Sequence, residues 1–191
     1  MNNQVQKQHW VGAVVEFLSS ALVMVAVVLG IRAFVIQPFR VDGQSMEPTL
    51  ENREYILVDK LSFRLRQPKR DDVVIFNPDK SRPELAYVKR VIGLPGDRVV
   101  VAGGRVKIYD DQYPSGQVIN EPYLAPGTQT LVDNDLSHKL DLTLGPNQYF
   151  LLGDNRQHSY DSRALGVVDQ SQLVGKAGFI ILPVSAAGSV K

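Results

Sequence analysis

The chain has 191 residues, of which 44% are hydrophobic and 21% are charged, so a packed core is expected and extensive disorder is not. Its formal net charge is +1, which gives no argument for a nucleic-acid partner, because such proteins normally carry a basic excess. The absence of cysteine excludes disulfides, cysteine nucleophiles and cysteine-ligated zinc.

The first predicted element is a hydrophobic helix. Residues 17–31 carry no charge and would span about 22 Å as a helix, less than the ~30 Å of a bilayer's hydrocarbon core. Extending the segment to residues 11–36 includes Glu16 and Arg32, which lie near its ends and can reach the lipid headgroups. We therefore expect a short cytoplasmic N-terminus followed by one transmembrane anchor, over residues 1–12 and 13–36 respectively.

Two other interpretations of this segment are a cleavable signal peptide and a buried core helix. The basic start of a signal peptide is represented only by Lys7, and residues 31–35 lack its A-x-A-like cleavage pattern. The strength of the apolar run argues against a core helix. The orientation of the predicted anchor across the membrane is ambiguous. Arg32, Arg40 and Arg53 follow the hydrophobic segment, and by the positive-inside rule they would weakly place the following domain in the cytoplasm.

The next stretch places a single serine between two residues that constrain the backbone. Gly43 precedes Ser45 by two residues and allows a tight approach, while Pro48 follows by three and prevents a helix interior. These flanking residues favour a turn in which the Ser45 hydroxyl is accessible, although an ordinary turn serine has the same sequence features.

Beyond residue 50 the chain consists of short β-type runs bounded by Gly, Pro, Asn or Asp, and no segment shows helical periodicity over three turns. The sequence Ala102–Arg105 predicts a two-residue hairpin turn. We expect a mostly β domain over residues 37–191, built as a coiled antiparallel sheet or barrel, with residues 98–147 as a smaller inserted β/loop subdomain. The expected strands are residues 55–58, 73–76, 85–92, 99–101, 106–109, 149–152 and 179–182.

The predicted strand of residues 85–92 carries a lysine with apolar neighbours. Alternation places Lys89 on the same face as Tyr87 and Val91. If these neighbours desolvate the amine, its pKa falls and a neutral lysine becomes available as a general base. The alternative is a solvated lysine at the edge of a sheet.

A polar loop over residues 153–163 follows the predicted strand of residues 149–152. Asp161 could pair with Arg163 and Asp154 with Arg156, or the whole loop could be solvated, with surface ion pairs of little value. Its spacing does not fit a calcium loop, and no cluster suits zinc. His158 could in principle complete a Ser-His-Asp triad with Ser45.

These segments, in this order, resemble the type I signal peptidases, the membrane-anchored Ser/Lys proteases of peptidase family S26. The resemblance rests on the hydrophobic N-terminal segment and on three motifs, residues 45–50, 87–97 and 153–163. It implies a mostly β catalytic domain outside the membrane, which would be the plasma membrane or the thylakoid membrane, with the N-terminus in the cytoplasm. It implies no metal and no organic cofactor.

The resemblance also implies roles for individual residues. Ser45 would be the nucleophile, Lys89 the general base, and Ser159 the residue whose hydroxyl orients the lysine amine. Asp161 and Arg163 would pair to hold the loop. Structural support would come from Asp154, Asn155, Arg156 and Arg90.

The implied partners are the lipid bilayer and preproteins with small residues at the first and third positions before the cut, and not nucleic acid. The substrate would add as an extended strand beside the strands that carry Ser45 and Lys89. Where some family members have a serine, this chain has Gly43, so the oxyanion would depend mainly on the Ser45 N–H. Residues expected to bind substrate in shallow apolar pockets are Phe39, Val41, Met46, Leu50, Tyr87 and Val88.

Two alternative functions can be distinguished from a signal peptidase by their sequence features. The autocleaving Ser/Lys repressors need a helical DNA-binding domain where this chain has its hydrophobic segment. A membrane-tethered β domain that binds exported proteins without cutting them would need neither Ser45 nor Lys89.

Overall fold

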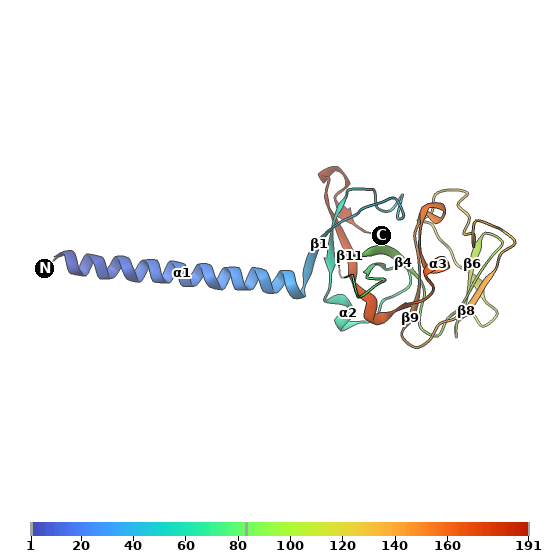
Figure 1. Ribbon diagram of the computed structural model, residues 1–191, viewed down its shortest axis with the longest axis horizontal. Helices are drawn as coiled ribbons and strands as arrows, with labels where there is room; N and C mark the ends of the chain where they lie inside the picture. Colours follow the sequence, from blue (N-terminus) through green and yellow to red (C-terminus); the bar gives the residue numbers. More distant parts are fainter. Residues whose placement is uncertain (1, 83, 191) are drawn as a thin grey trace.

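The structure is a computed structural model that describes residues 2–82 and 84–190, apart from the side chains of residues 2–9, 11, 13 and 31–34. One long helix, α1 (Asn2–Phe34), leads into a β body (Figure 1). Among the described residues, no helix has both the length and the apolar content needed to cross a membrane. The side chains of residues 31–34, part of the predicted span, lie outside the described residues.

The β body contains a larger, eight-stranded antiparallel sheet. Its order is β1-β2-β11-β3-β4-β9-β10, and β12 pairs with β11. β4 is central and almost wholly buried, which places whatever side chains it carries inside the domain. The strands are β1 (Ile36–Arg40), β2 (Tyr55–Asp59), β3 (Val73–Phe76), β4 (Tyr87–Gly93), β9 (Gln148–Leu152), β10 (Val168–Asp169), β11 (Leu173–Leu182) and β12 (Gly188–Ser189).

A smaller four-stranded sheet, in the order β7-β6-β5-β8, lies at the end of the β body away from α1 (Figure 1). Its strands are β5 (Arg98–Ala102), β6 (Arg105–Tyr109), β7 (Gln117–Val118) and β8 (Leu140–Thr143). The β5–β6 turn uses Gly103 and Gly104, both with positive φ, as a two-residue hairpin turn requires. The remaining helices are single turns: α2 (Ser62–Leu65), α3 (Ser162–Leu165), η1 (Arg156–His158), η2 (Gln170–Gln172) and η3 (Val184–Ala186).

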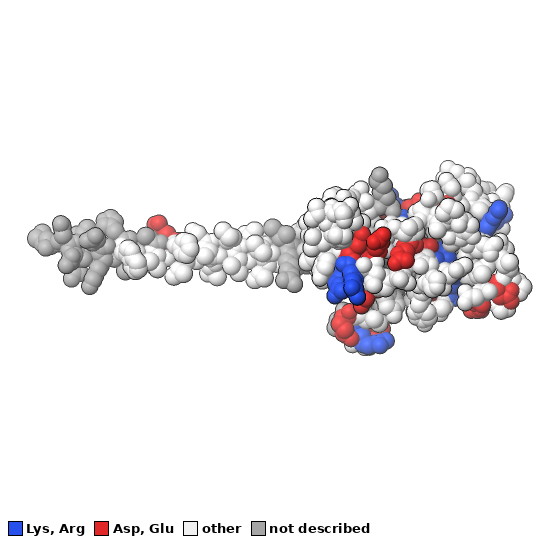
Figure 2. Space-filling model, turned by 90° about the horizontal axis from the view of Figure 1, so that it is seen from above, with Lys and Arg blue, Asp and Glu red and all other residues white. Residues whose placement is uncertain are grey.

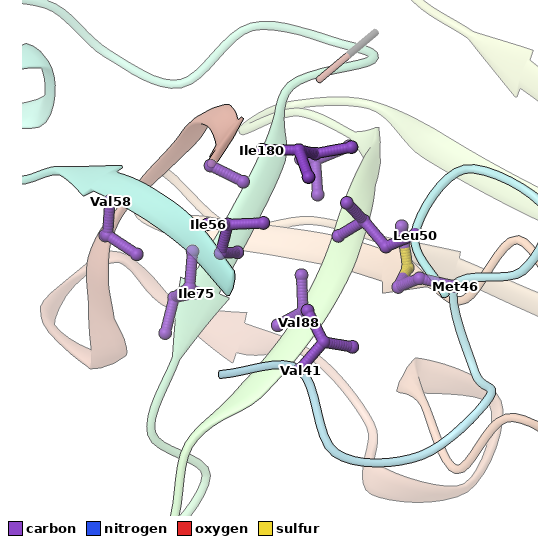
Figure 3. Close-up of a cluster of buried hydrophobic side chains, with 10 residues drawn as sticks. Val41, Met46, Leu50, Ile56, Val58, Ile75, Val88 and Ile180 are labelled. Carbon is purple, nitrogen blue, oxygen red and sulfur yellow. The ribbon is translucent and has the colours of Figure 1, made fainter. Parts of the chain in front are cut away.

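Three apolar clusters fill the β body, and one of them includes residues on both sides of Ser45 in the sequence. Val41, Met46 and Leu50 are buried there in one cluster with Val88 of β4 (Figure 3). The other side chains of this cluster come from β2, β3 and β11. The segment around Ser45 is thus held by its own apolar residues on the central strands.

The mostly β prediction is confirmed, and several element boundaries differ from the expectation. The predicted anchor extended to residue 36, but α1 ends at Phe34 and Ile36 begins β1. β1 was missed because Pro38 is unusual in a strand; it is tolerated here because β1 is an edge strand. β11 is longer than predicted, because Gly175 and Gly178 lie where its register shifts rather than where it ends.

Candidate active site

Ser45 and Lys89 lie within hydrogen-bond distance of each other. Ser45 is in a turn that follows Gly43, whose φ of +105° suits glycine. Lys89 projects from β4, where its amine donates to Ser45 Oγ at 2.8 Å and to the carbonyl oxygen of Val88 at 2.9 Å. The predicted strand around Ser45 is wrong, because its backbone forms consecutive turns.

The environment of Lys89 is nearly free of solvent. The residue is 3% exposed, and its amine lies 5.5 Å from the centre of the Tyr87 ring. Burial lowers the pKa of Lys89 to about 8, although the carboxylates of Asp161 and Asp154 act in the opposite direction. A substantial fraction of the amine is therefore neutral near pH 8 and able to accept a proton from a hydroxyl.

The loop of residues 153–163 fixes both ends of the turn that carries Ser45. The N–H of Asn155 donates to the carbonyl oxygen of Ser45 at 3.0 Å. At the other end, the Thr49 hydroxyl donates to Asp154 at 2.5 Å. These two contacts set the position of the Ser45 backbone relative to the loop.

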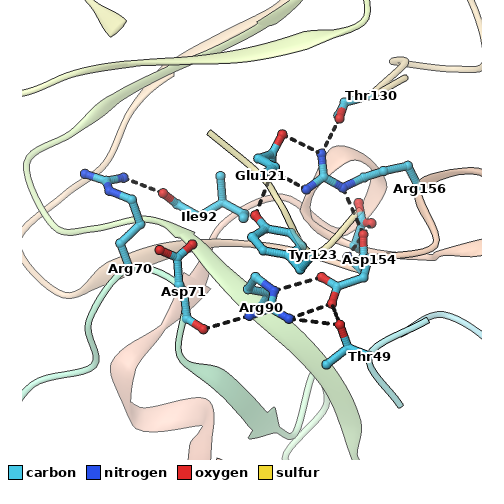
Figure 4. Close-up of polar contacts among 12 residues, drawn as sticks. Thr49, Arg70, Asp71, Arg90, Ile92, Glu121, Tyr123, Thr130, Asp154 and Arg156 are labelled. Carbon is cyan, nitrogen blue, oxygen red and sulfur yellow. Dashed lines mark hydrogen bonds and ion pairs between the residues drawn. The ribbon is translucent and has the colours of Figure 1, made fainter. Parts of the chain in front are cut away.

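Asp154 is itself held by Arg90 of β4 (Figure 4). The Arg90 guanidinium donates to the two carboxylate oxygens at 2.9 and 2.7 Å, and also to the carbonyl oxygen of Asp71 at 3.0 Å. Both side chains are almost completely buried, at 1% and 0% exposed. Because Lys89 and Arg90 are adjacent on β4, one strand positions the amine and also the loop that holds Ser45.

Asp161 and Arg163 form the predicted ion pair at 2.8 Å. The Asp161 carboxylate also accepts from the N–H of Gly153, and the Arg163 guanidinium donates to the carbonyl oxygens of Arg156 and Leu131. The pair therefore ties the two arms of the loop together.

Gly153 occupies a position with no room for a side chain. A Cβ there would lie 2.2 Å from Ser159 Oγ and 2.5 Å from the carbonyl oxygen of Ser45. The predicted hydrogen bond between Ser159 and the Lys89 amine is not made: the Ser159 hydroxyl is buried against Gly153 and has no hydrogen-bond partner among the described residues. Ser159 contributes to the packing of the loop in this structure.

Arg156 does not pair with Asp154, contrary to one of the sequence interpretations. Its guanidinium instead binds Glu121 and the hydroxyl of Thr130 (Figure 4). Asp154 is already held by Arg90, so the two acidic groups and the two arginines form separate pairs.

Comparison with known proteins identifies the family. Residues 14–182 match the family described as signal peptidase, peptidase S26. The chain belongs to this family.

Several relatives carry the name signal peptidase I. The enzyme of Bacillus caldolyticus is 40% identical over 84% of this chain and 87% of its own length. Signal peptidase I S of Bacillus subtilis is 36% identical over 90% of each chain. Probable signal peptidase I-2 of Synechocystis is 36% identical over 86% of this chain and 71% of its own.

The residues expected to bind substrate in this signal peptidase family member differ in their exposure. Phe39 and Tyr87 are half-buried and have surface to offer a peptide. Val41, at 4% exposed, and Val88, at 7%, lie just beneath the surface. Met46 and Leu50 are buried in the core, at 1% and 0% exposed, and their expected role in lining substrate pockets stays a prediction.

The histidine interpretation finds no support in the geometry. His158 is exposed and its ring contacts the Asn155 side chain at 3.0 Å, while the Ser45 hydroxyl bonds to Lys89. Within the described part of the chain, no group of three or more acidic or histidine side chains could hold a metal ion.

Four residues that contact the site were not identified from the sequence: Thr49, Glu121, Tyr123 and Thr130. Thr49 lies inside the Ser45 motif, so its position was a usable signal. The others lie in the stretch between β6 and β8, which shows no periodicity and whose contacts depend on the tertiary fold.

Proposed function

We propose that the chain is a membrane-bound serine endopeptidase that removes signal peptides from exported preproteins. The observation that carries this proposal is the 2.8 Å contact between the Ser45 hydroxyl and the buried amine of Lys89. Family membership supports the same function, because the similar proteins of Bacillus and Synechocystis are named signal peptidase I.

The mechanism uses Lys89 as the base. Its neutral amine takes the Ser45 proton as Oγ attacks the scissile carbonyl, and returns that proton to the leaving amine. A water molecule, deprotonated by the same amine, then hydrolyses the acyl-enzyme. The Ser45 N–H would donate to the oxyanion.

The substrate would bind as an extended segment alongside Phe39 and Tyr87, which are both half-buried; the Tyr87 ring lies 5.5 Å from the Lys89 amine. We expect small residues at the first and third positions before the cut, in shallow pockets beside Val41 and Val88, which are 4% and 7% exposed. Closure of the bound peptide over the site would further exclude water from Lys89.

We assign the anchor to α1. From residue 10 to residue 30 its only charged side chain is Glu16, and the described side chains form an uncharged rod apart from one acidic group (Figure 2). Its large apolar side chains are exposed, including Phe17, at 73%, and Leu22, at 71%, as suits a helix whose partner is lipid. The catalytic domain would lie outside a plasma or thylakoid membrane, with the N-terminus in the cytoplasm.

The test compares the full-length protein with Ser45→Ala and Lys89→Ala, using a preprotein substrate in detergent or vesicles. Both variants are expected to lose cleavage while retaining the circular dichroism of the β domain. Two exposed positions, Ser115→Ala and Lys139→Ala, serve as matched controls and should cleave normally. Wild-type protein that binds the preprotein without cutting it would instead support the tethered-binder function.

A further inference from the structure

The stretch that precedes β8 contributes a buried carboxylate to the loop that holds Ser45. Both carboxylate oxygens of Glu121 accept hydrogen bonds from the Arg156 guanidinium (Figure 4). The Arg156 side chain is completely buried and that of Glu121 is 11% exposed. Thr130 supplies a third acceptor to the same guanidinium.

Tyr123 joins this contact to the Arg90–Asp154 pair. Its hydroxyl donates to Glu121 at 2.8 Å, and its ring lies 3.9 Å from the guanidinium carbon of Arg90. Burial raises the pKa of the Tyr123 hydroxyl, so it remains a neutral donor to the carboxylate. The residues between β7 and β8 thus touch both arginines that organise the loop.

A continuous series of contacts leads from Glu121 to the nucleophile. Arg156, held by Glu121, donates through Nε to the carbonyl oxygen of Gly153 at 2.9 Å. The neighbouring Asn155 donates its N–H to the carbonyl oxygen of Ser45. A displacement of Arg156 is therefore transmitted directly to the backbone of Ser45.

The charge on Arg156 makes this displacement sensitive to Glu121. An arginine keeps its charge at all ordinary pH values, so without a carboxylate partner its buried guanidinium is driven toward water. That movement would carry Gly153 and Asn155 with it. Misplacement of a reacting group by about 1 Å can cost on the order of 100-fold in rate.

We propose that Glu121 is a positioning residue that acts through Arg156 to hold the loop of residues 153–163, and so aligns Ser45 with Lys89. This inference rests on the proposed function, and it gives the inserted sheet region a part in the reaction. It differs from a purely structural connection between the two sheets, which would affect stability alone.

The test uses the full-length protein with Glu121→Gln, which keeps the shape of the side chain and removes its charge. We expect kcat per folded molecule to fall by about 10–100-fold at a temperature well below unfolding, with KM changed by less than about threefold. The pH midpoint of activity should stay near the wild-type value, because burial is the main cause of the lowered pKa of Lys89 and Glu121→Gln leaves that burial unchanged. Asp141→Asn in β8, which removes the exposed ion pairs of Asp141 with Arg98 and Lys139, is the matched control and should leave kcat unchanged.

The possible outcomes distinguish failure of the proposed peptidase function from failure of the positioning role of Glu121. Wild-type protein that cuts no preprotein would overturn the proposed function itself. If wild type cleaves and folded Glu121→Gln has the wild-type kcat, with only a lower melting temperature, the positioning role is overturned. If Glu121→Gln does not fold, Thr130→Val decides: it removes one acceptor from Arg156, and an unchanged kcat in that variant would also overturn the role.

Discussion

Lys89 is a charged side chain in a place that solvent hardly reaches, and this conflict is what makes it useful as a base. Burial disfavours the ammonium form, so the pKa of Lys89 falls from its ordinary value of 10.5 to about 8. The 2.8 Å contact with Ser45 holds the amine nitrogen within proton-transfer distance of the hydroxyl. No other group needs to act as the base.

The pH dependence of cleavage follows from this pKa. Below about 8 the amine is protonated and cannot accept a proton, so kcat/KM should rise about tenfold per pH unit on the acid side and level off above pH 8. Initial rates on a peptide substrate across this range would measure it, with circular dichroism at each pH as the control for folding. A profile that is flat from acid to alkaline pH would contradict a lysine base.

Gly153 is the residue for which a single methyl group should be most damaging. In Gly153→Ala the new Cβ would clash with Ser159 Oγ and with the carbonyl oxygen of Ser45. The Ser159 side chain can move away, but the carbonyl belongs to the backbone, so relieving that clash displaces Ser45 itself. We expect kcat to fall by about 100-fold or more. Adding Ser159→Ala should not restore it, because the contact with Ser45 remains.

The matched control is Gly178→Ala in β11, where the nearest atom would lie at an ordinary contact distance of 3.5 Å. That variant should cleave at the wild-type rate. If Gly153→Ala is equally active, or if Ser159→Ala rescues it, the tight approach between Gly153 and Ser45 does not control the reaction.

β4 and the loop of residues 153–163 are joined by a salt bridge that solvent does not reach. Asp154→Asn leaves the Arg90 guanidinium in the core without the carboxylate that now pairs with it, and it also weakens the bond that Thr49 makes. Because loss of one partner from a buried pair is strongly destabilising, we expect a loss of roughly 3–5 kcal/mol in the free energy of unfolding. Urea denaturation would measure it.

An exposed pair provides the comparison. Asp141→Asn removes the partner of Arg98, whose side chain is 47% exposed, and the stability lost there should be much smaller. Equal losses from the two variants would mean that the Arg90–Asp154 pair contributes no more than a surface contact.

The strands of the larger sheet could be predicted where their sequence is uniform. β3 matches its predicted range because four consecutive apolar residues end at Asn77. β11 could be seen only in part, because Gly175 and Gly178 interrupt its pattern while its backbone continues. Strands can therefore be predicted from sequence where their side chains form a clear pattern. They cannot be predicted where glycines interrupt that pattern and only backbone hydrogen bonds continue the strand.

The site shows the same division. Ser45 and Lys89 could be named because each stands in a motif with a distinctive order. The pairing of Asp154 with Arg90, and of Arg156 with Glu121, could not be predicted, because the partners are distant in sequence. Electrostatic pairing in a buried site is decided by the fold that brings the charges together.

The molecule as a whole has a sharply divided surface. α1 presents apolar side chains that have no protein partner among the described residues, and the two serines in it, Ser19 and Ser20, donate to the carbonyl oxygen of Glu16 within the helix. Such internal bonding satisfies their hydroxyls without water. The β body carries nearly all of the charge (Figure 2).

The orientation across the membrane sets two effects against each other. Arg32, Arg40 and Arg53 follow the apolar segment and Lys7 precedes it, which would favour a cytoplasmic β body. Large domains, however, are translocated largely regardless of their charge, and a peptidase acting on exported proteins must meet them outside. We therefore expect the N-terminus inside and the β body outside.

The absence of cysteine permits a direct test, because any introduced thiol is unique. In intact cells, a membrane-impermeant maleimide should label Ser115→Cys, on an exposed part of the smaller sheet region, and should label Asn3→Cys only after the membrane is permeabilised. The reverse pattern would place the β body in the cytoplasm, away from its proposed substrates. Equal labelling of both thiols before permeabilisation would mean that α1 does not span the bilayer, and the anchor would have to be withdrawn while the Ser45–Lys89 site could stand.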